Sequence, residues 1–179
     1  MSLLLLLLAC TGKDDTDTAE AGPTVVAPPL VVNEFLTRNV TDEADPAGEF
    51  DDWIEIYNDS DAIVQFEGLY LTDDFETPTK WELPVGQGID AHGYVVIWCD
   101  KDDGSDGVTA SQGARHANFQ LNGKGEEIGI YYIEDGNDGA WADQVEFESQ
   151  ADDLSFAHVP DASLNWVSGE PTPGDSNGD

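Results

Sequence analysis

Two glutamates stand inside apolar, strand-like runs and could form a catalytic pair. Glu34 lies in VVNEFL and Glu55 lies in DWIEIYN. A glycoside hydrolase needs two carboxyl groups at a fixed separation, one of them with a raised pKa. Carboxylate pairs also arise by chance among 38 acidic residues. We therefore expect each glutamate to lie on the polar side of its strand, with Arg38 or Lys80 as an ion-pair partner, and we keep a hydrolase as the remote alternative.

The segment DWIEIYN alternates between two kinds of side chain. A strand period of two puts Ile54 and Ile56 on one face and Trp53, Glu55 and Tyr57 on the other. We expect the isoleucines to face the core and the second face to look outward. Exposed aromatic rings can stack on sugars, so Trp53 and Glu55 are the candidate ligand-contact residues. For Trp53 we favour packing in the core or at its rim over such a ligand contact.

An acidic loop, DKDDGSDG at 100–107, resembles a calcium loop. An EF-hand needs Asp or Asn at its third position and Glu at its twelfth. Counted from Asp102, these positions hold Gly104 and Gly113, so the EF-hand pattern fails. A weak surface calcium site remains the alternative, and its candidate ligands are Asp100, Asp102, Asp103 and Asp106. No other cofactor is expected.

Other catalytic and metal patterns are missing from the sequence. There is no Gly-x-Ser-x-Gly elbow and no Walker-type loop. His92, His116 and His158 are too scattered for a zinc site. Cys99 ends the run YVVIWC and is expected to be a core or edge residue rather than a nucleophile.

The charge of the chain limits its partners. The 179 residues contain 38 Asp and Glu against 6 Lys and Arg, a formal net charge of −32 at pH 7. Such a chain repels phosphate backbones and anionic lipid surfaces, so nucleic acid is not an expected partner. The acidity fits solubility, or a saline habitat in which salt screens the self-repulsion.

The chain opens with MSLLLLLLAC, six leucines followed shortly by a cysteine. The run is too short to span a bilayer and resembles the apolar part of an export signal. LLAC resembles a bacterial lipobox, which implies cleavage before Cys10 and a diacylglycerol on its sulfur. No Lys or Arg precedes the leucines, so we expect the true signal to begin upstream of Met1. Residues 1–9 are then a signal remnant, and residues 10–29 are the lipidated cysteine and a flexible Thr/Asp/Pro linker.

The remaining chain has the punctuation of an all-β domain. Short β-branched and aromatic runs alternate with turn signals such as NDSD, PVGQG and EDGNDG. The expected strands are 30–37, 52–58, 68–73, 79–83, 94–99, 126–133, 141–147 and 154–159. YVVIWC is apolar on both faces, which predicts a central strand between covering layers. Gly129 in mid-strand predicts a bulge or a large neighbour packed against it.

A family resemblance rests on segments that occur in a fixed order. VVNEFL, DWIEIYN, FEGLYLTDD, TKWELPVGQGIDAHGYVVIWCD, HANFQLNGKGEEIGIYY, SFAHVPDASLNWV and PTPGDSN together resemble lamin tail domains. The most specific part runs from Trp53 to Trp98, and Pro171–Gly174 marks the C-terminal edge. The resemblance covers about residues 30–177. It implies an immunoglobulin-like antiparallel β-sandwich, used for display or contact rather than for catalysis.

These observations combine into one expectation. The chain should be a non-catalytic, exported, lipid-anchored lamin-tail-domain protein of the bacterial cell envelope, at the outer membrane or cell surface, with secretion as the alternative. Its partner would be a protein or a glycan, and Cys10 would hold it to the membrane. The alternative function is a calcium- or carbohydrate-binding β-sandwich module.

Overall fold

The computed structural model describes residues 24–101, 115–134 and 138–178. Within these ranges all regular elements are β-strands, and no helix is long and apolar enough to cross a membrane. Sheet A has the order β11-β10-β1-β2-β7, with β1 Leu30–Leu36, β2 Asp52–Asn58, β7 Tyr94–Cys99, β10 Ser155–His158 and β11 Trp166–Gly169. Sheet C has the order β5-β4-β8-β9, with β4 Leu69–Thr72, β5 Trp81–Glu82, β8 Gly125–Tyr132 and β9 Ala140–Glu148. Sheet B is the short pair β3 Val64–Gln65 and β6 Gly88–Ile89.

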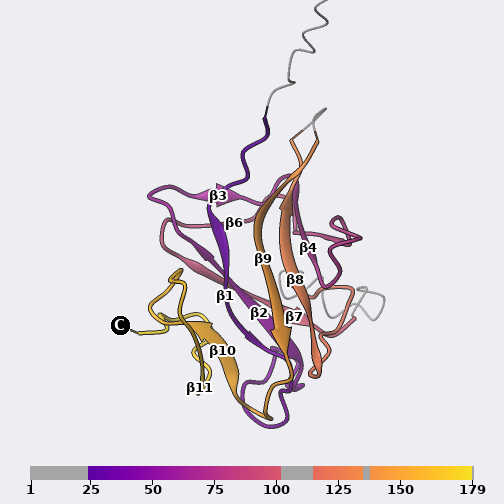
Figure 1. Ribbon diagram of the computed structural model, residues 1–179, viewed down its shortest axis with the longest axis vertical. Coiled ribbons are helices and arrows are strands. Elements are labelled where there is room, and N and C mark those ends of the chain that lie inside the picture. The colour runs from indigo at the N-terminus through magenta and orange to yellow at the C-terminus, as the bar shows by residue number, and fades with distance from the viewer. Residues whose placement is uncertain (1–23, 102–114, 135–137, 179) are drawn as a thin grey trace, which may run out of the picture.

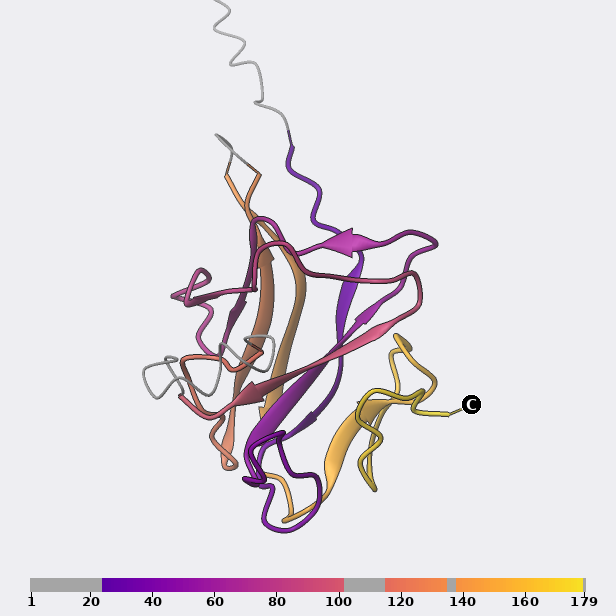
Figure 2. The same ribbon diagram turned by 180° about the vertical axis from the view of Figure 1, so that it is seen from behind.

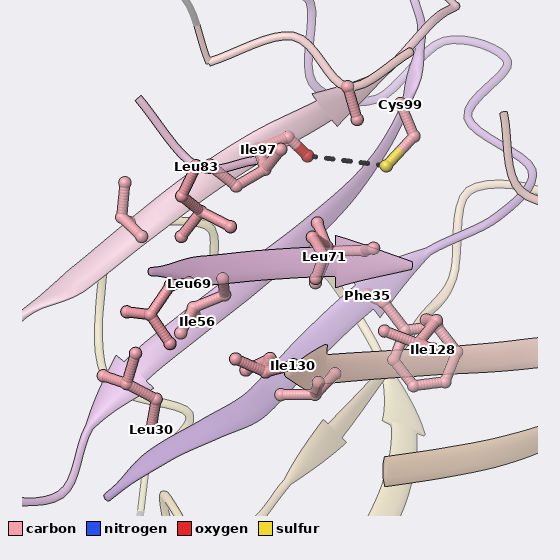
Figure 3. Packing of buried hydrophobic residues seen from close by; sticks show 14 of the residues in the cluster. Leu30, Phe35, Ile56, Leu69, Leu71, Leu83, Ile97, Cys99, Ile128 and Ile130 are labelled. Carbon is pink, nitrogen blue, oxygen red and sulfur yellow. Dashed lines mark hydrogen bonds between the residues drawn. The ribbon is translucent and has the colours of Figure 1, made fainter. Parts of the chain in front are cut away.

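Sheets A and C enclose one hydrophobic core, and their strands pair antiparallel throughout. Figure 3 shows apolar side chains of both sheets meeting in this core, among them Phe35, Ile56, Ile97, Leu69, Leu71, Ile128 and Ile130. Fully burying one such side chain stabilises the fold by about 1.5–3 kcal/mol. The predicted fold class, an immunoglobulin-like antiparallel sandwich, is confirmed.

The expected strands all appear, with boundaries shifted by a few residues. Ile54 and Ile56 face the core as predicted. The strand expected at 79–83 shrinks to the two residues of β5. The sequence did not predict β3, β6 or β11, because runs of two to four residues carry too little alternation to stand out from a loop.

The position of β7 differs from the expectation of a central strand. In the described residues β7 is the last strand of sheet A and pairs with β2 along one side. On its other side, within the part of the chain that the structure describes, Trp98 forms an isolated bridge to His116. The apolar character of both faces of β7 therefore reflects the layers above and below it, not neighbours on both sides.

A register shift between β1 and β2 changes the direction of side chains on the outer face of sheet A. Val32 is the partner of Ile56, but the next pair joins Glu34 to Glu55, which leaves Asn33 as an extra residue. Such a bulge re-aims side chains. The N–H of Val32 is taken by a side chain of sheet C, because the Oδ2 atom of Asp143 accepts it at 2.9 Å.

A third layer lies over sheet A. Figures 1 and 2 show the segment after β11 on the side of β1 and β2 that faces away from β8 and β9. We call residues 171–178 the C-terminal strap. The position of the strap determines whether the polar side chains on the outer face of sheet A are exposed to solvent or buried.

Candidate functional site

The two candidate glutamates are brought together, but they are not exposed. Glu34 and Glu55 are Cα partners on neighbouring strands, β1 and β2. Both residues are 0% accessible to solvent. The prediction that they look outward into solvent is wrong. Strand alternation does place them on the face opposite the core, but the C-terminal strap covers that face.

Their predicted ion-pair partners lie elsewhere. Arg38 pairs with Asp152, and Lys80 pairs with Asp73. Hydrogen-bond donors from the main chain of the C-terminal strap, together with one asparagine of the bulge, take the place of a cation at the two glutamates.

Glu34 binds the first part of the C-terminal strap. The N–H of Thr172 donates to the Oε1 and Oε2 atoms of Glu34 at 3.0 and 3.2 Å. The hydroxyl of Thr172 donates to Oε2 at 2.9 Å. One threonine thus satisfies both oxygens of a carboxylate that lies 138 residues earlier in the chain.

Glu55 binds the next part of the C-terminal strap. The N–H of Gly174 donates to its Oε2 atom at 2.6 Å, and the side-chain amide of Asn33 donates to its Oε1 atom at 3.0 Å. Gly174 has a φ of +84°, a conformation that glycine adopts without the penalty that a Cβ imposes. Asn33 reaches Glu55 because the bulge in β1 turns it toward this face.

A third carboxylate, Asp161, secures the end of the C-terminal strap. Its oxygens accept hydrogen bonds from the hydroxyl of Ser176 at 2.7 Å, the N–H of Asn177 at 3.1 Å and the side chain of Asn33 at 2.9 Å. The hydroxyl of Tyr94 donates to it at 2.8 Å. Strands β1 and β7, the loop after β10 and the strap therefore meet at Asp161.

The carboxylates have different proton affinities. Burial raises the pKa of Glu55 to about 7, and burial also raises the pKa of Glu34. Burial acts on Asp161 in the same direction, but the hydrogen bonds from Asn33, Ser176 and Asn177 outweigh it and lower the pKa of Asp161. With a pKa of about 7, Glu55 titrates near neutral pH.

In this arrangement Glu34 and Glu55 bind the protein's own C-terminal strap rather than a substrate. Every carboxylate oxygen of Glu34 and Glu55 accepts a hydrogen bond from the protein itself. General acid–base catalysis requires the carboxyl group to reach the reacting atom within hydrogen-bond distance. In this conformation neither carboxylate is open to a substrate, and the pair serves to hold the C-terminal strap.

Trp53, the second candidate ligand-contact residue, is also buried. Its exposed fraction is 0%, and it packs with Leu36 and Trp98 in a small cluster on the outer face of sheet A. Its indole N–H has no hydrogen-bond partner within the described residues. The core-packing alternative for Trp53 is the one that holds, and the ring cannot serve as a sugar platform in this conformation.

Half-exposed aromatic rings gather instead on the outer face of sheet C. The ring centroid of Trp141 lies 5.3 Å from that of Phe75 and 4.8 Å from that of Tyr131. Trp141 covers Gly129, where an added Cβ would meet the indole at 2.5 Å. The large neighbour predicted for Gly129 is therefore Trp141, and this glycine was the sequence signal that could have located the cluster.

The predicted calcium ligands are placed only in part. Asp100 lies beside His116, whose Nδ1 atom contacts its Oδ2 atom, while Asp102, Asp103 and Asp106 lie outside the described residues. Within the described part of the chain, no group of three or more His, Cys, Asp or Glu side chains is arranged to hold a metal ion.

Of the two cysteines, only Cys99 lies among the described residues. Cys99 is a free cysteine in the main core, where burial raises its thiol pKa well above the ordinary value. A buried thiol of this kind is unreactive. Cys10, the predicted lipidation site, lies outside the described residues.

Comparison with known protein families identifies the family of this domain. Residues 26–149, more than half of the chain, match the family described as Lamin Tail Domain. Comparisons with curated proteins and with solved structures gave no match. The matched region includes β1 to β9, so β10 and β11, which complete sheet A, and the C-terminal strap lie beyond it. The chain belongs to the lamin tail domain family.

Proposed function

We propose that this protein is an exported, lipid-anchored, non-catalytic binding module of the bacterial cell envelope, at the outer membrane or cell surface. One observation carries the non-catalytic part. Glu34 and Glu55, the pair best suited to acid–base chemistry, accept hydrogen bonds from the C-terminal strap and have no exposed surface. Function then falls to the exposed surfaces of the sandwich, which contact a protein or a glycan.

The anchoring part is supported by the order of segments in the chain. A leucine run, Cys10 and a Thr/Asp/Pro linker precede the sandwich. Figure 1 shows the chain entering the sandwich at one end of its long axis, beside β3. A tether attached there leaves the outer face of sheet C free to meet a partner, whereas the C-terminal strap covers Glu34 and Glu55 on the outer face of sheet A.

Membrane fractionation tests the anchor. The wild-type protein should sediment with membranes, and Cys10→Ser should release it to the soluble fraction because the thioether cannot form. Cys99→Ser is the matched control and should stay with the membranes. Retention of Cys10→Ser would contradict lipidation.

A carbohydrate ligand is the second candidate, and the aromatic cluster on sheet C favours it. Phe75, Tyr131 and Trp141 are half-buried rings that lie together on one outer face, and such rings provide large, rigid contact areas. A glycan array should give hits that Trp141→Ala abolishes. Trp166→Ala, which removes a half-buried tryptophan of sheet A, should keep them. An array without hits would contradict this candidate.

A further inference from the structure

Hydrogen bonds to Glu34, Glu55 and Asp161 hold the C-terminal strap. Its residues are half-buried or exposed, and none of them inserts a large apolar side chain. Beneath it, Asn33, Glu34 and Glu55 are each 0% exposed. In this structure the polar groups of sheet A therefore act as a receptor, and the strap is its ligand.

The sequence of the C-terminal strap fits this receptor by its pattern of donors. Pro171 and Pro173 have no N–H, so the main-chain donors within 171–174 are Thr172 and Gly174. Both are used, one by Glu34 and the other by Glu55. The main chain thus presents no unused donor over these four residues.

A turn within the strap fixes the conformation of its main chain. Pro173 and Gly174 are the central residues of a turn that is closed by the N–H of Asp175 and the C=O of Thr172 at 3.0 Å. Pro followed by a positive-φ Gly is the preferred sequence for such a turn. A short peptide of this sequence would lose little conformational freedom on binding.

The strap is attached in a way that permits release. Gly169, just before it, has open space around its Cα, with no atom within 4 Å of an added Cβ. Gly169 ends β11, the outermost strand on its side of sheet A. Moving residues 170–178 away would break no strand pairing and would leave the hydrophobic core intact.

We propose that the outer face of sheet A is a peptide-recognition surface, and that residues 171–177 of a second copy of this chain can occupy it in place of the resident strap. The receptor and the ligand segment are both present in every copy, so exchange between copies recreates each hydrogen bond. This is domain swapping of one short element. The inference deepens the proposed binding function by naming a partner, and it rests on that proposal only in this respect; the anchor at Cys10 plays no part in it.

Charge sets the conditions for exchange. Each copy carries a formal charge of −32, so two copies repel one another over the Debye length, about 10 Å at 0.1 M salt. The hydrogen bonds of the strap to Glu34 and Glu55 are short and partly buried, and salt screens them less than it screens the long-range repulsion. Exchange between copies should therefore increase with salt concentration.

Fluorescence anisotropy with a labelled peptide of residues 169–178 tests this peptide-recognition surface. The full-length receptor carries Gly174→Pro, which removes the donor to Glu55 and forbids a φ of +84°, so that its own strap is displaced. In wild type the tethered strap competes at an effective concentration on the order of millimolar. We expect the peptide to bind Gly174→Pro roughly tenfold or more tightly than wild type.

The matched control is the same peptide with Gly174→Pro, which should not bind either receptor. Equal binding of both peptides, or no binding by a Gly174→Pro receptor whose circular dichroism and Tm show it to be folded, would overturn the inference. Either result would leave membrane fractionation and glycan binding unaffected, so failure here is distinct from failure of the proposed function.

A disulfide trap serves if Gly174→Pro does not fold. Ser176→Cys and Asp161→Cys are made in separate Cys10→Ser chains, because these two side chains are in contact in the structure. Mixing them at high protein and salt concentration should give disulfide-linked dimers several-fold faster than Ser176→Cys alone. Equal rates in the mixture and in the single variant would overturn exchange between copies.

Discussion

The outer faces of sheets A and C differ in their exposure to solvent. In β9 of sheet C, Gln144, Glu146 and Glu148 are exposed while Phe147 is buried, as expected for a strand with one wet face. In β2 of sheet A, all six residues after Asp52 are buried. The sequence of β2 also alternates polar with apolar, so alternation alone does not say that the polar face meets water.

The difference between the sheets lies in what covers them. A buried carboxylate is costly unless hydrogen bonds satisfy it. In sheet A the C-terminal strap delivers those bonds to Glu34 and Glu55. The outer face of sheet C leaves Glu146 and Glu148 exposed to water, and the rings of Phe75, Tyr131 and Trp141 gather on it.

The same substitution on both outer faces should separate them most clearly. Trp53→Ala removes a fully buried ring and should lower the free energy of unfolding by about 3–5 kcal/mol. Trp141→Ala removes a half-exposed ring and should cost roughly 1–2 kcal/mol. Urea unfolding followed by circular dichroism measures both. Equal losses would mean that the two faces are equally buried in solution.

The sequence predicted the strands but not the cover over sheet A. Period-two patterns identify β2 and its two faces from seven consecutive residues. Whether the second face is wet depends on Thr172, which lies 138 positions from Glu34. No local pattern encodes that contact. The segment VVNEFL likewise contains no sequence signal that predicts the bulge at Asn33, which completes the site.

Stability should depend on pH through the covered face. The pKa of Glu55 is raised from 4.5 to about 7, so the native state holds this proton more tightly than the unfolded chain. The stabilisation is fully present below about pH 4.5 and is lost as the pH rises to 7. The shift corresponds to roughly 3 kcal/mol at most. Urea unfolding at a series of pH values measures it.

Glu55→Gln provides the control for this pH dependence. The variant has no group to titrate, so its free energy of unfolding should fall less steeply between pH 4.5 and 7. Glu146→Gln, on the exposed face of sheet C, should keep the wild-type slope. If Glu55→Gln and wild type have the same slope, burial does not set the proton affinity of Glu55.

The smallest expected effect comes from one glycine of the C-terminal strap. Gly174→Ala adds a Cβ with open space around it, so the cost is the positive φ alone, about 1–2 kcal/mol. Hydrogen exchange at the amides of residues 172 and 174 should become faster. Gly48→Ala, at a similar φ in a distant loop, should leave these two rates unchanged. Unchanged rates in Gly174→Ala would show that the strap does not depend on this turn.

The order β11-β10-β1 has a mechanical consequence. The chain enters sheet A at Leu30, the start of β1, and leaves it at Gly169, the end of β11. Because β10 is antiparallel to both neighbours, β1 and β11 run in the same direction, and these two points lie at opposite ends of the sheet. A pull between a tether on the N-terminal side and a partner holding the strap would load the strands in shear. All the hydrogen bonds between β1, β10 and β11 would then resist together instead of opening one after another.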